Sequence, residues 1–206
     1  LTGFTDVEDL VEAINAGQVY RYITRPWDPD ELKHVVDRAS ETYDLIKRQN
    51  EALHRAESQS KLMVTVGQLA GQSMEKTEAL TFLASGFGQI LNADACMLLL
   101  ADGQTAGSYG SVEIAATNAN SLVQSALTGQ STQSATGLQS NAELSTDALY
   151  ASGSECHLAV PVTYQGESLA ALSLQWNTAY STLEDVSQLL GLISPQIALS
   201  LKATVL

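Results

Sequence analysis

The sequence contains few positively charged side chains. Lysine and arginine together number 10 against 23 aspartates and glutamates, so the 206 residues carry a formal net charge of −13. Such a chain repels nucleic acid and anionic lipid, and we exclude both as partners. The shortage is uneven, because residues 1–61 hold 8 of the basic side chains and residues 62–206 hold 2. This shift predicts a domain boundary near residue 61.

Cysteine and long apolar runs are also scarce. Two cysteines do not make a disulfide framework, which favours a reduced, cytoplasmic protein. No apolar stretch is long enough to span a bilayer and no secretory signal is present, so we expect no membrane insertion. The chain begins with Leu1 rather than methionine, and we interpret it as a fragment, a processed product or part of something longer.

Catalytic and metal-binding patterns are missing from the sequence. No serine lies in a Gly-x-Ser-x-Gly turn, and no glycine-rich stretch matches a phosphate loop. Zinc needs about four ligands, and Cys156-His157 stands far along the chain from His34 and His54. The sequence therefore predicts no enzyme and no metal site.

The dominant feature that is present is a long helix from Asp30 to about Leu69. Pro26 and Pro29 stand just before it, where proline can open a helix, and no proline or glycine follows until Gly67. Apolar or small side chains recur there in the four-three step of a coiled-coil seam, with one amide among them. The seam positions are Val36, Ala39, Tyr43, Ile46, Asn50 and Leu53.

The seam pattern breaks at Glu57 and Ser60 and restarts in a shifted phase at Leu62, Val66 and Leu69. A phase break of this kind changes the winding of a coiled coil. We predict a parallel coiled-coil connector between two copies of the chain, which makes a homodimer. The alternative is an ordinary amphipathic helix that packs on its own domain.

The N-terminal segment reads as the end of a strand, a helix, a strand and a turn. The string LTGFTDVEDLVEAINAGQVYRYITRPWDPDEL resembles the last third of a response-regulator receiver domain. The resemblance makes residues 1–29 the end of strand 4, helix 4 and strand 5, and residues 30–61 the last receiver helix continuing as the connector. By that resemblance Thr2 matches the hydroxyl that contacts a phosphoryl group, and Tyr22 matches the aromatic switch residue of the fifth strand. Pro26 matches a proline that is commonly preceded by a cis bond, and Arg25 stands where the family has its phosphate-pairing lysine.

The receiver resemblance is incomplete in one important respect. An aspartyl phosphate needs a carboxylate nucleophile beside a metal ion. The family's acceptor aspartate and acidic metal-binding pair belong to strands that this sequence does not contain. We therefore expect this segment not to accept a phosphoryl group.

Residues 62–206 show α+β order. We expect helices at 62–73, 76–91, 118–127 and 183–201, strands at 95–101, 111–117, 157–164 and 168–176, and a long loop at 130–155 with a short helix near Ala148. The strings QILNADACMLLLADG, HLAVPVTYQGESLAALSLQW and LLGLISPQIALSL resemble the GAF domain family. The resemblance implies an antiparallel sheet flanked by helices, which binds a small molecule or chromophore, or binds nothing and mediates dimerisation.

GAF domains that bind cyclic nucleotides or bilins carry characteristic sequence motifs, and this sequence does not match them. The cyclic-nucleotide signature is absent, and Cys156-His157 abuts a strand whereas the bilin-binding pair of the family lies upstream on a helix. We expect no cofactor and no covalent bilin at Cys156. A ligand would be non-covalent and apolar or neutral, held between the late strands and residues 118–154; the alternative is a filled core with no pocket. The predicted wall is Met97, Leu99, Leu158, Val160, Leu172 and Leu174.

These observations lead to a functional hypothesis with two alternatives. The chain is interpreted as a non-enzymatic signal-transduction module, in which a receiver remnant and a GAF sensor or dimerisation domain signal through helix packing. One alternative is a small-molecule sensor of a cyclase, phosphodiesterase or kinase whose output domain is absent. The other is a structural or interaction subunit of a larger protein assembly. The sequence names no ligand.

Overall fold

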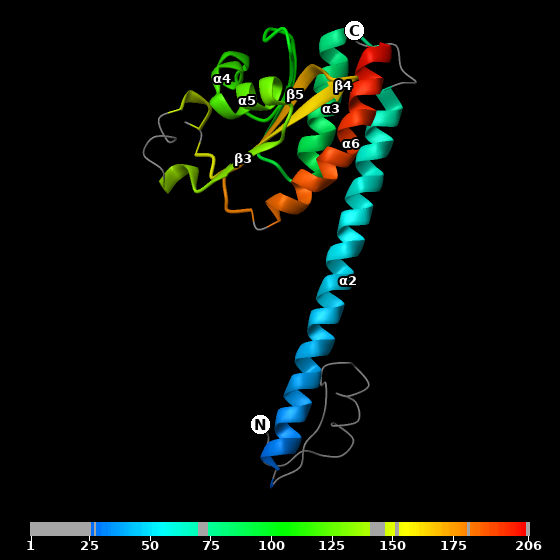
Figure 1. The fold of residues 1–206 in the computed structure, drawn as a ribbon, viewed down its shortest axis with the longest axis vertical. Coiled ribbons are helices and arrows are strands. Elements are labelled where there is room, and N and C mark those ends of the chain that lie inside the picture. Colours follow the sequence, from blue (N-terminus) through cyan, green and yellow to red (C-terminus); the bar gives the residue numbers. More distant parts are fainter. Residues whose placement is uncertain are drawn as a thin grey trace. The chain divides into compact units, whose positions relative to one another are not determined.

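The computed structural model describes residues 26, 28–69, 74–140, 147–150, 153–180 and 182–204, and the chain divides into two compact units, residues 1–54 and 55–206. Helices and strands alternate in the order of an α+β domain (Figure 1). The elements are α2 (Pro29–Leu69), α3 (Lys76–Ile90), β1 (Ala95–Leu100), β2 (Ala106–Tyr109), α4 (Ile114–Ala119), α5 (Ser121–Gly129), β3 (Gln133–Thr136), η1 (Leu138–Ser140), η2 (Ala148–Tyr150), β4 (Cys156–Tyr164), β5 (Glu167–Trp176) and α6 (Leu183–Thr204).

Helix α2 is a single helix of 41 residues, as its sequence predicts. Pro29 is its first residue, where the missing proline N–H costs nothing. The Asp28 carboxylate accepts a hydrogen bond from the backbone N–H of Asp30 at 2.8 Å, and Asp30 and Glu31 lie in the first turn beside the positive end of the helix dipole.

The five strands form one antiparallel sheet in the order β2-β1-β5-β4-β3. Strands β4 and β5 are a hairpin that turns at Gln165 and Gly166, both with positive φ. The predicted fold class is confirmed: an antiparallel sheet flanked by helices, with a long helix preceding it.

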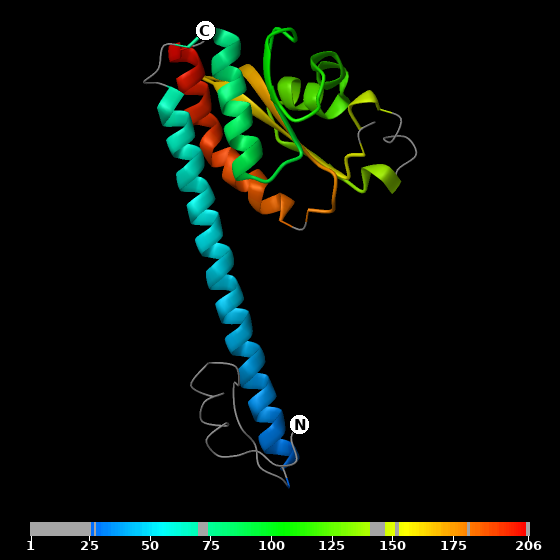
Figure 2. The ribbon, with the colours of Figure 1, turned by 180° about the vertical axis from the view of Figure 1, so that it is seen from behind.

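Helices cover both faces of the sheet (Figures 1 and 2). Helices α3 and α6 and the last part of α2 pack on one face, where the largest apolar cluster buries Leu62, Val66 and Leu69 of α2. Helices α4 and α5 and the two short 3-10 helices lie on the other face, over smaller clusters. None of the helices in the described ranges has the length and apolarity that a bilayer span requires.

One predicted strand is wrong. Residues 111–117 were expected to be extended, but Ile114–Ala119 is helix α4, and the strand beside β1 is Ala106–Tyr109. Its sequence, Ala-Gly-Ser-Tyr, has little strand propensity. Gly107 is required there because a Cβ at this position would stand 2.0 Å from the backbone nitrogen of Thr81 in α3. The close approach of a helix to a strand, which is a tertiary feature, defines this element.

A second difference lies in the predicted loop at 130–155. It contains strand β3, whose residues pair with Cys156–Ala159 of β4. Gln133–Thr136 is polar and only alternately half-buried, so its extended form depends on that pairing. The short helix expected near Ala148 is present as η2.

Candidate functional site

The two faces of the sheet carry different side chains, because the strand register is fixed. Met97 lies opposite Ser173, Leu99 opposite Ala171, and Ala159 opposite Ser173. Residues directly opposite one another point to the same face. These side chains lie beneath α5, where the apolar ones form a buried cluster with Val123 and Ala126.

The six predicted pocket residues therefore do not line one site. Met97 and Leu99 lie beneath α5, whereas the other four lie in the core on the opposite face. The prediction is wrong for those four: Leu158, Val160, Leu172 and Leu174. The reason is that both faces of the sheet are covered, so that all six residues of β1 are buried and the apolar run shows no alternation to reveal the inward side.

A row of polar side chains, all buried except the half-buried Asp147, occupies the face beneath α4, α5 and η2. Nδ2 of Asn120 lies 2.9 Å from Oδ2 of Asp147 and 3.0 Å from the hydroxyl of Tyr150. That hydroxyl lies 2.6 Å from Nδ1 of His157, and Nε2 of His157 lies 2.9 Å from the hydroxyl of Ser173. We call these five residues the polar row.

The polar row has a defined direction of hydrogen bonding. Oδ1 of Asn120 accepts from the backbone N–H groups of Leu122 and Val123, so the amide orientation is fixed and Nδ2 donates to Tyr150. A buried hydroxyl proton needs an acceptor, and Nδ1 of His157 is the one within reach in the described residues. Nε2 of His157 then carries the proton and donates to Ser173.

Burial sets the ionisation of this row. It lowers the pKa of His157 to about 3, so the imidazole is neutral at physiological pH. Burial also raises the pKa of Tyr150 to about 12. The hydrogen bond from Asn120 lowers this pKa in part, and the negative charge of Asp147 raises it further. Both groups are therefore neutral, and each has its hydrogen bonds satisfied.

His157 and Ser173 do not form a nucleophilic pair. A histidine that activates a serine must accept the hydroxyl proton. Here Nε2 of His157 is the donor, and both side chains are buried within the domain. Within the ranges that the structure describes, no group of three or more His, Cys, Asp and Glu could hold a metal ion.

The polar row was not among the predicted site residues, although the sequence carries a signal for it. His157 in β4, and Ser173 and Gln175 in β5, are polar residues inside apolar strands, and the last two are spaced by two residues. Such spacing places side chains on one face of a strand. Gln175 accepts a hydrogen bond from Ser154 at 2.8 Å, which extends the polar character of this face.

A separate cleft of about 420 Å³ opens near the turn between β1 and β2. Its polar side chains are largely engaged with the fold, since Gln124 donates to Asn118 and Ser168 donates to the carbonyl of Leu127. Its one carboxylate, Asp102, accepts from the backbone of Thr105, which lowers its pKa. The lining is Ala101, Asp102, Gly103, Asn118, Gln124, Leu127, Thr128 and Ser168.

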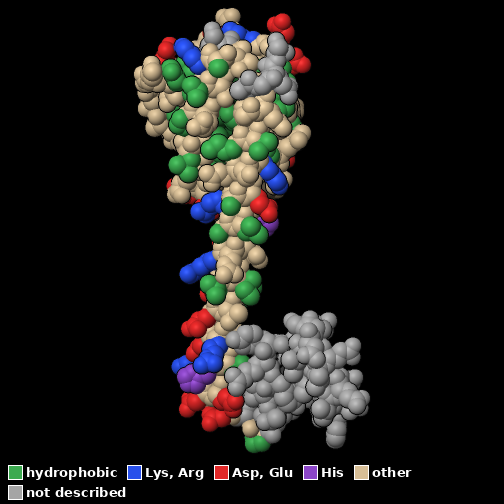
Figure 3. Space-filling model, turned by 90° about the vertical axis from the view of Figure 1, so that its right-hand side faces the viewer, with side chains coloured by type: hydrophobic (Ala, Val, Ile, Leu, Met, Phe, Trp, Pro, Cys, Tyr) green, Lys and Arg blue, Asp and Glu red, His purple; other side chains and the backbone are tan. Residues whose placement is uncertain are grey.

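The predicted seam lies on an exposed face of α2. Val36, Tyr43, Ile46 and Leu53 are 51–67% exposed, and Figure 3 shows apolar side chains at intervals along the helix. Ala39 is half-buried and Asn50 is exposed.

The predicted phase shift of the seam is wrong. Leu62, Val66 and Leu69 are buried in the core of their own domain. Val64 continues the original heptad, because it lies 28 residues after Val36, and it is 56% exposed. Residues 62 and 66 lie on the side of the helix opposite residue 64, since each residue turns the helix by about 100°. Helix α2 therefore has two apolar faces, one packed internally and one exposed.

A family comparison bears on the fold just described. The model of the GAF domain matches residues 77–201, which include the sheet and nearly all of α3 and α6. The chain belongs to the GAF domain family. This GAF domain is a regulatory domain of the signalling sensor type.

Solved structures show the same fold. The GAF domain of A. aeolicus nlh2 in an inactive state matches with a TM-score of 0.58 and 12% identity, over 72% of this chain and 98% of that chain. The free methionine-R-sulfoxide reductase from Neisseria meningitidis, in complex with its substrate, matches with a TM-score of 0.58 and 13% identity, over 73% and 91%. At such identities the likeness shows the fold alone.

A curated relative matches outside the GAF domain, in the N-terminal region. The hydrogenase transcriptional regulatory protein HoxA of Bradyrhizobium diazoefficiens is 38% identical over 47 residues, which is 23% of this chain and 10% of HoxA. The chain thus spans about a tenth of the length of the curated relatives it matches.

The cysteines of this GAF domain are both free and buried. Cys156 belongs to the core beneath α3 and α6, whereas its neighbour His157 lies on the other face of the sheet. Burial raises the pKa of the Cys96 thiol, which is therefore protonated at neutral pH.

The predicted receiver residues are largely outside the described ranges. Thr2, Tyr22 and Arg25 lie outside the described residues, and Pro26 is an exposed residue in a bend before α2. The receiver resemblance therefore stays a prediction.

Proposed function

We propose that this chain is a non-enzymatic regulatory module of a signal-transduction protein, which pairs in parallel with a second copy through α2 and signals by a change in helix packing. One observation carries the proposal. An exposed face of α2 carries apolar side chains at heptad positions from Val36 to Leu53, and the same heptad, after polar residues at Glu57 and Ser60, reaches the exposed Val64. The similarity to HoxA supports our interpretation of residues 1–29 as a receiver remnant and residues 30–61 as a connector.

A second copy of the chain fits this face better than another partner does. In a parallel, in-register pair each seam residue meets its own copy, so one stripe serves both partners. The two Asn50 amides can then bond one another, which fixes the register. Burying a large apolar side chain contributes about 1.5–3 kcal/mol, so Tyr43, Ile46 and Leu53 supply a substantial driving force.

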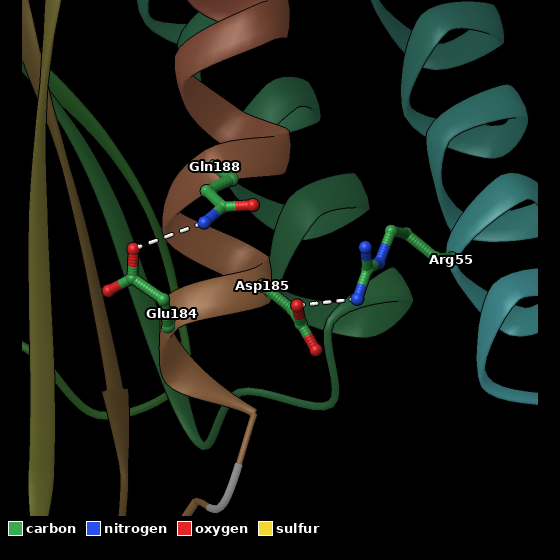
Figure 4. Close-up of polar contacts among 4 residues, drawn as sticks. All are labelled: Arg55, Glu184, Asp185 and Gln188. Atoms are coloured by element: carbon green, nitrogen blue, oxygen red, sulfur yellow. Dashed lines mark hydrogen bonds and ion pairs between the residues drawn. The ribbon is translucent and has the colours of Figure 1, made fainter. Parts of the chain in front are cut away.

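Helix α6 adds a second exposed stripe beside the last part of α2. Arg55 of α2 and Asp185 of α6 form an ion pair at 2.5 Å (Figure 4). The two helices run in the same direction in both ribbon views (Figures 1 and 2). Leu192 and Leu199 of α6 are seven residues apart and 67% and 54% exposed. Together with Val64 they support a four-helix bundle across the dimer.

The absence of catalysis in this proposal is supported by the chemistry of the buried groups. The histidine of the polar row donates to its serine, and the cysteines are buried within the core. Neither arrangement activates a nucleophile.

Cysteine cross-linking tests the pairing. Ile46→Cys places a thiol at a seam position, and a parallel in-register dimer brings it against its own copy. We expect an intermolecular disulfide under mild oxidation, with little background because both native cysteines are buried. Arg48→Cys, on the outer side of the helix, is the matched control and should not cross-link.

Other results would contradict the proposal. Equal cross-linking at positions 46 and 48 would show collision rather than pairing. A monomer by light scattering at micromolar concentration would exclude the dimer, and larger defined oligomers would favour a subunit of an assembly instead.

A further inference from the structure

Tyr150 fills a site that the rest of the domain builds around it. Its ring packs with Leu138 and Leu149, against the partly buried Val112 and Ala116, in a cluster distinct from the two larger ones. Its hydroxyl reaches Asn120 and His157 at the polar end. The surroundings therefore have apolar walls and a polar base, which is the character of a ligand site.

The groups that surround the Tyr150 hydroxyl and Tyr150 itself come from different kinds of element. Asn120 is the N-cap of α5, His157 belongs to β4 and Ser173 to β5. All three are buried, and Asn120 and His157 each make a hydrogen bond in addition to the one with Tyr150. Tyr150 belongs to the three-residue 3-10 helix η2, outside the sheet and the long helices. The receiving half is thus rigid, whereas the occupant lies on a short segment.

The hydrogen-bond directions define what the site accepts. Its occupant must accept from Nδ2 of Asn120 and donate to Nδ1 of His157 through one oxygen. A neutral phenolic hydroxyl does both, whereas a phenolate or a carboxylate has no proton to donate. The carboxylate of Asp147, 2.9 Å from Nδ2 of Asn120, also opposes an anion there. The ring of Tyr150 meets the imidazole edge to face, with centroids 5.4 Å apart.

We propose that this GAF domain contains a site for a neutral phenolic ring, that Tyr150 is its internal occupant, and that an external phenol binds by displacing Tyr150. The inference deepens the regulatory function proposed above and rests on it for its biological meaning. Exchange of the internal ring for an external one releases η2 from the sheet.

Removal of the occupant is the first test. In Tyr150→Ala, phenol should raise the melting temperature saturably, because it restores the missing ring and hydroxyl. Benzene should need at least about tenfold higher concentration, since it leaves the buried Nδ1 of His157 without a hydrogen-bond donor and takes one acceptor from Nδ2 of Asn120. Equal effects of phenol and benzene would overturn the proposal. Failure of the variant to fold with phenol as well as without it would also overturn it.

Weakening of the occupant is the second test. Tyr150→Phe keeps the ring but loses both hydrogen bonds, so it competes less well for the site. Phenol, followed by ligand-observed NMR on the full chain, should bind this variant about tenfold more tightly than the unmodified chain. Tyr164→Phe, a half-buried tyrosine outside the cluster, should bind phenol as the unmodified chain does. The same affinity, or no binding, for the unmodified chain and Tyr150→Phe would contradict the displacement.

Measuring the oligomeric state of the same samples by light scattering tests the proposed dimer independently of the phenol site. A monomer that binds phenol as described would overturn the dimer and support the site. A dimer in which phenol and benzene act alike on Tyr150→Ala would do the reverse.

Discussion

Among the residues that the structure describes, His157 has a strongly lowered pKa whose effect on the folded state falls in the mildly acidic range. Burial lowers its pKa to about 3, whereas an unfolded histidine titrates near 6.5. Between these values the unfolded chain binds a proton that the folded chain excludes. The contribution of His157 to the free energy of unfolding is therefore complete above pH 6.5 and is lost as the pH falls toward 3.

We expect the free energy of unfolding to fall by about 1.4 kcal/mol per pH unit below 6.5, or about 2 kcal/mol between pH 6.5 and 5, because of this one residue. Urea unfolding at several pH values measures it. His157→Gln should be less stable at pH 7 but should lose that slope. His34→Gln, at an exposed position on α2, should keep it. An unchanged slope in His157→Gln would assign the effect to other groups.

Gly107 is a residue whose replacement should be severe. A methyl group there would meet the Leu80 carbonyl carbon at 2.1 Å and the Thr81 nitrogen at 2.0 Å, so α3 and β2 must separate. We expect Gly107→Ala to lower stability by at least about 3 kcal/mol, measured by urea unfolding. Gly191→Ala is the control: nothing lies within 4 Å of its added methyl, and it should be neutral or mildly stabilising. Similar effects at both positions would refute the steric account.

At the scale of elements, the exposed face of α2 makes a prediction about assembly. Ile46→Asp combined with Leu53→Asp would place charges inside the seam, which costs several kcal/mol unless the helices part. We expect the double variant to be monomeric by light scattering, with unchanged helical content of the GAF domain. Leu45→Asp is the matched control, because Leu45 is 58% exposed but lies outside the seam. A dimeric double variant would place the contact elsewhere.

Some elements could be predicted from sequence and others could not, for physical reasons. Helix α2, the β4–β5 hairpin and α6 have long periodic patterns or clear turns, so local chemistry determines them. Strands β2 and β3 have weak patterns, and they are extended because of α3 and β4 respectively.

The candidate site was harder to predict than the fold. The buried strand β1 is apolar on both faces, so residue type did not show which side faced α5. Four members of the polar row, Asn120, Tyr150, His157 and Ser173, come from four elements, and only packing brings these elements together. The polar residues within the otherwise apolar strands β4 and β5 were the sequence feature that could have indicated the polar row.

At the scale of the whole molecule, the seam before residue 57 and Val64 after it line up only because the helix between them makes a fixed number of turns. Inserting two residues after Glu57 turns the downstream helix by about 200°, which moves Val64 away from the upstream seam line. We expect Val64→Cys to cross-link in the parent chain and in a seven-residue insertion, but not in the two-residue insertion. Cross-linking that is insensitive to the length of the insertion would show that the seam does not extend to Val64.

The scarcity of positive charge has a practical consequence for anyone who digests this protein. After residue 61 the sequence offers trypsin two sites, Lys76 at the start of α3 and Lys202 in the last turn of α6, both exposed. The product, Thr77–Lys202, holds the whole sheet and both cysteines in one peptide. It is too long for routine peptide mass spectrometry, so the GAF domain would be nearly invisible in tryptic proteomics. A glutamate-specific protease would make it detectable.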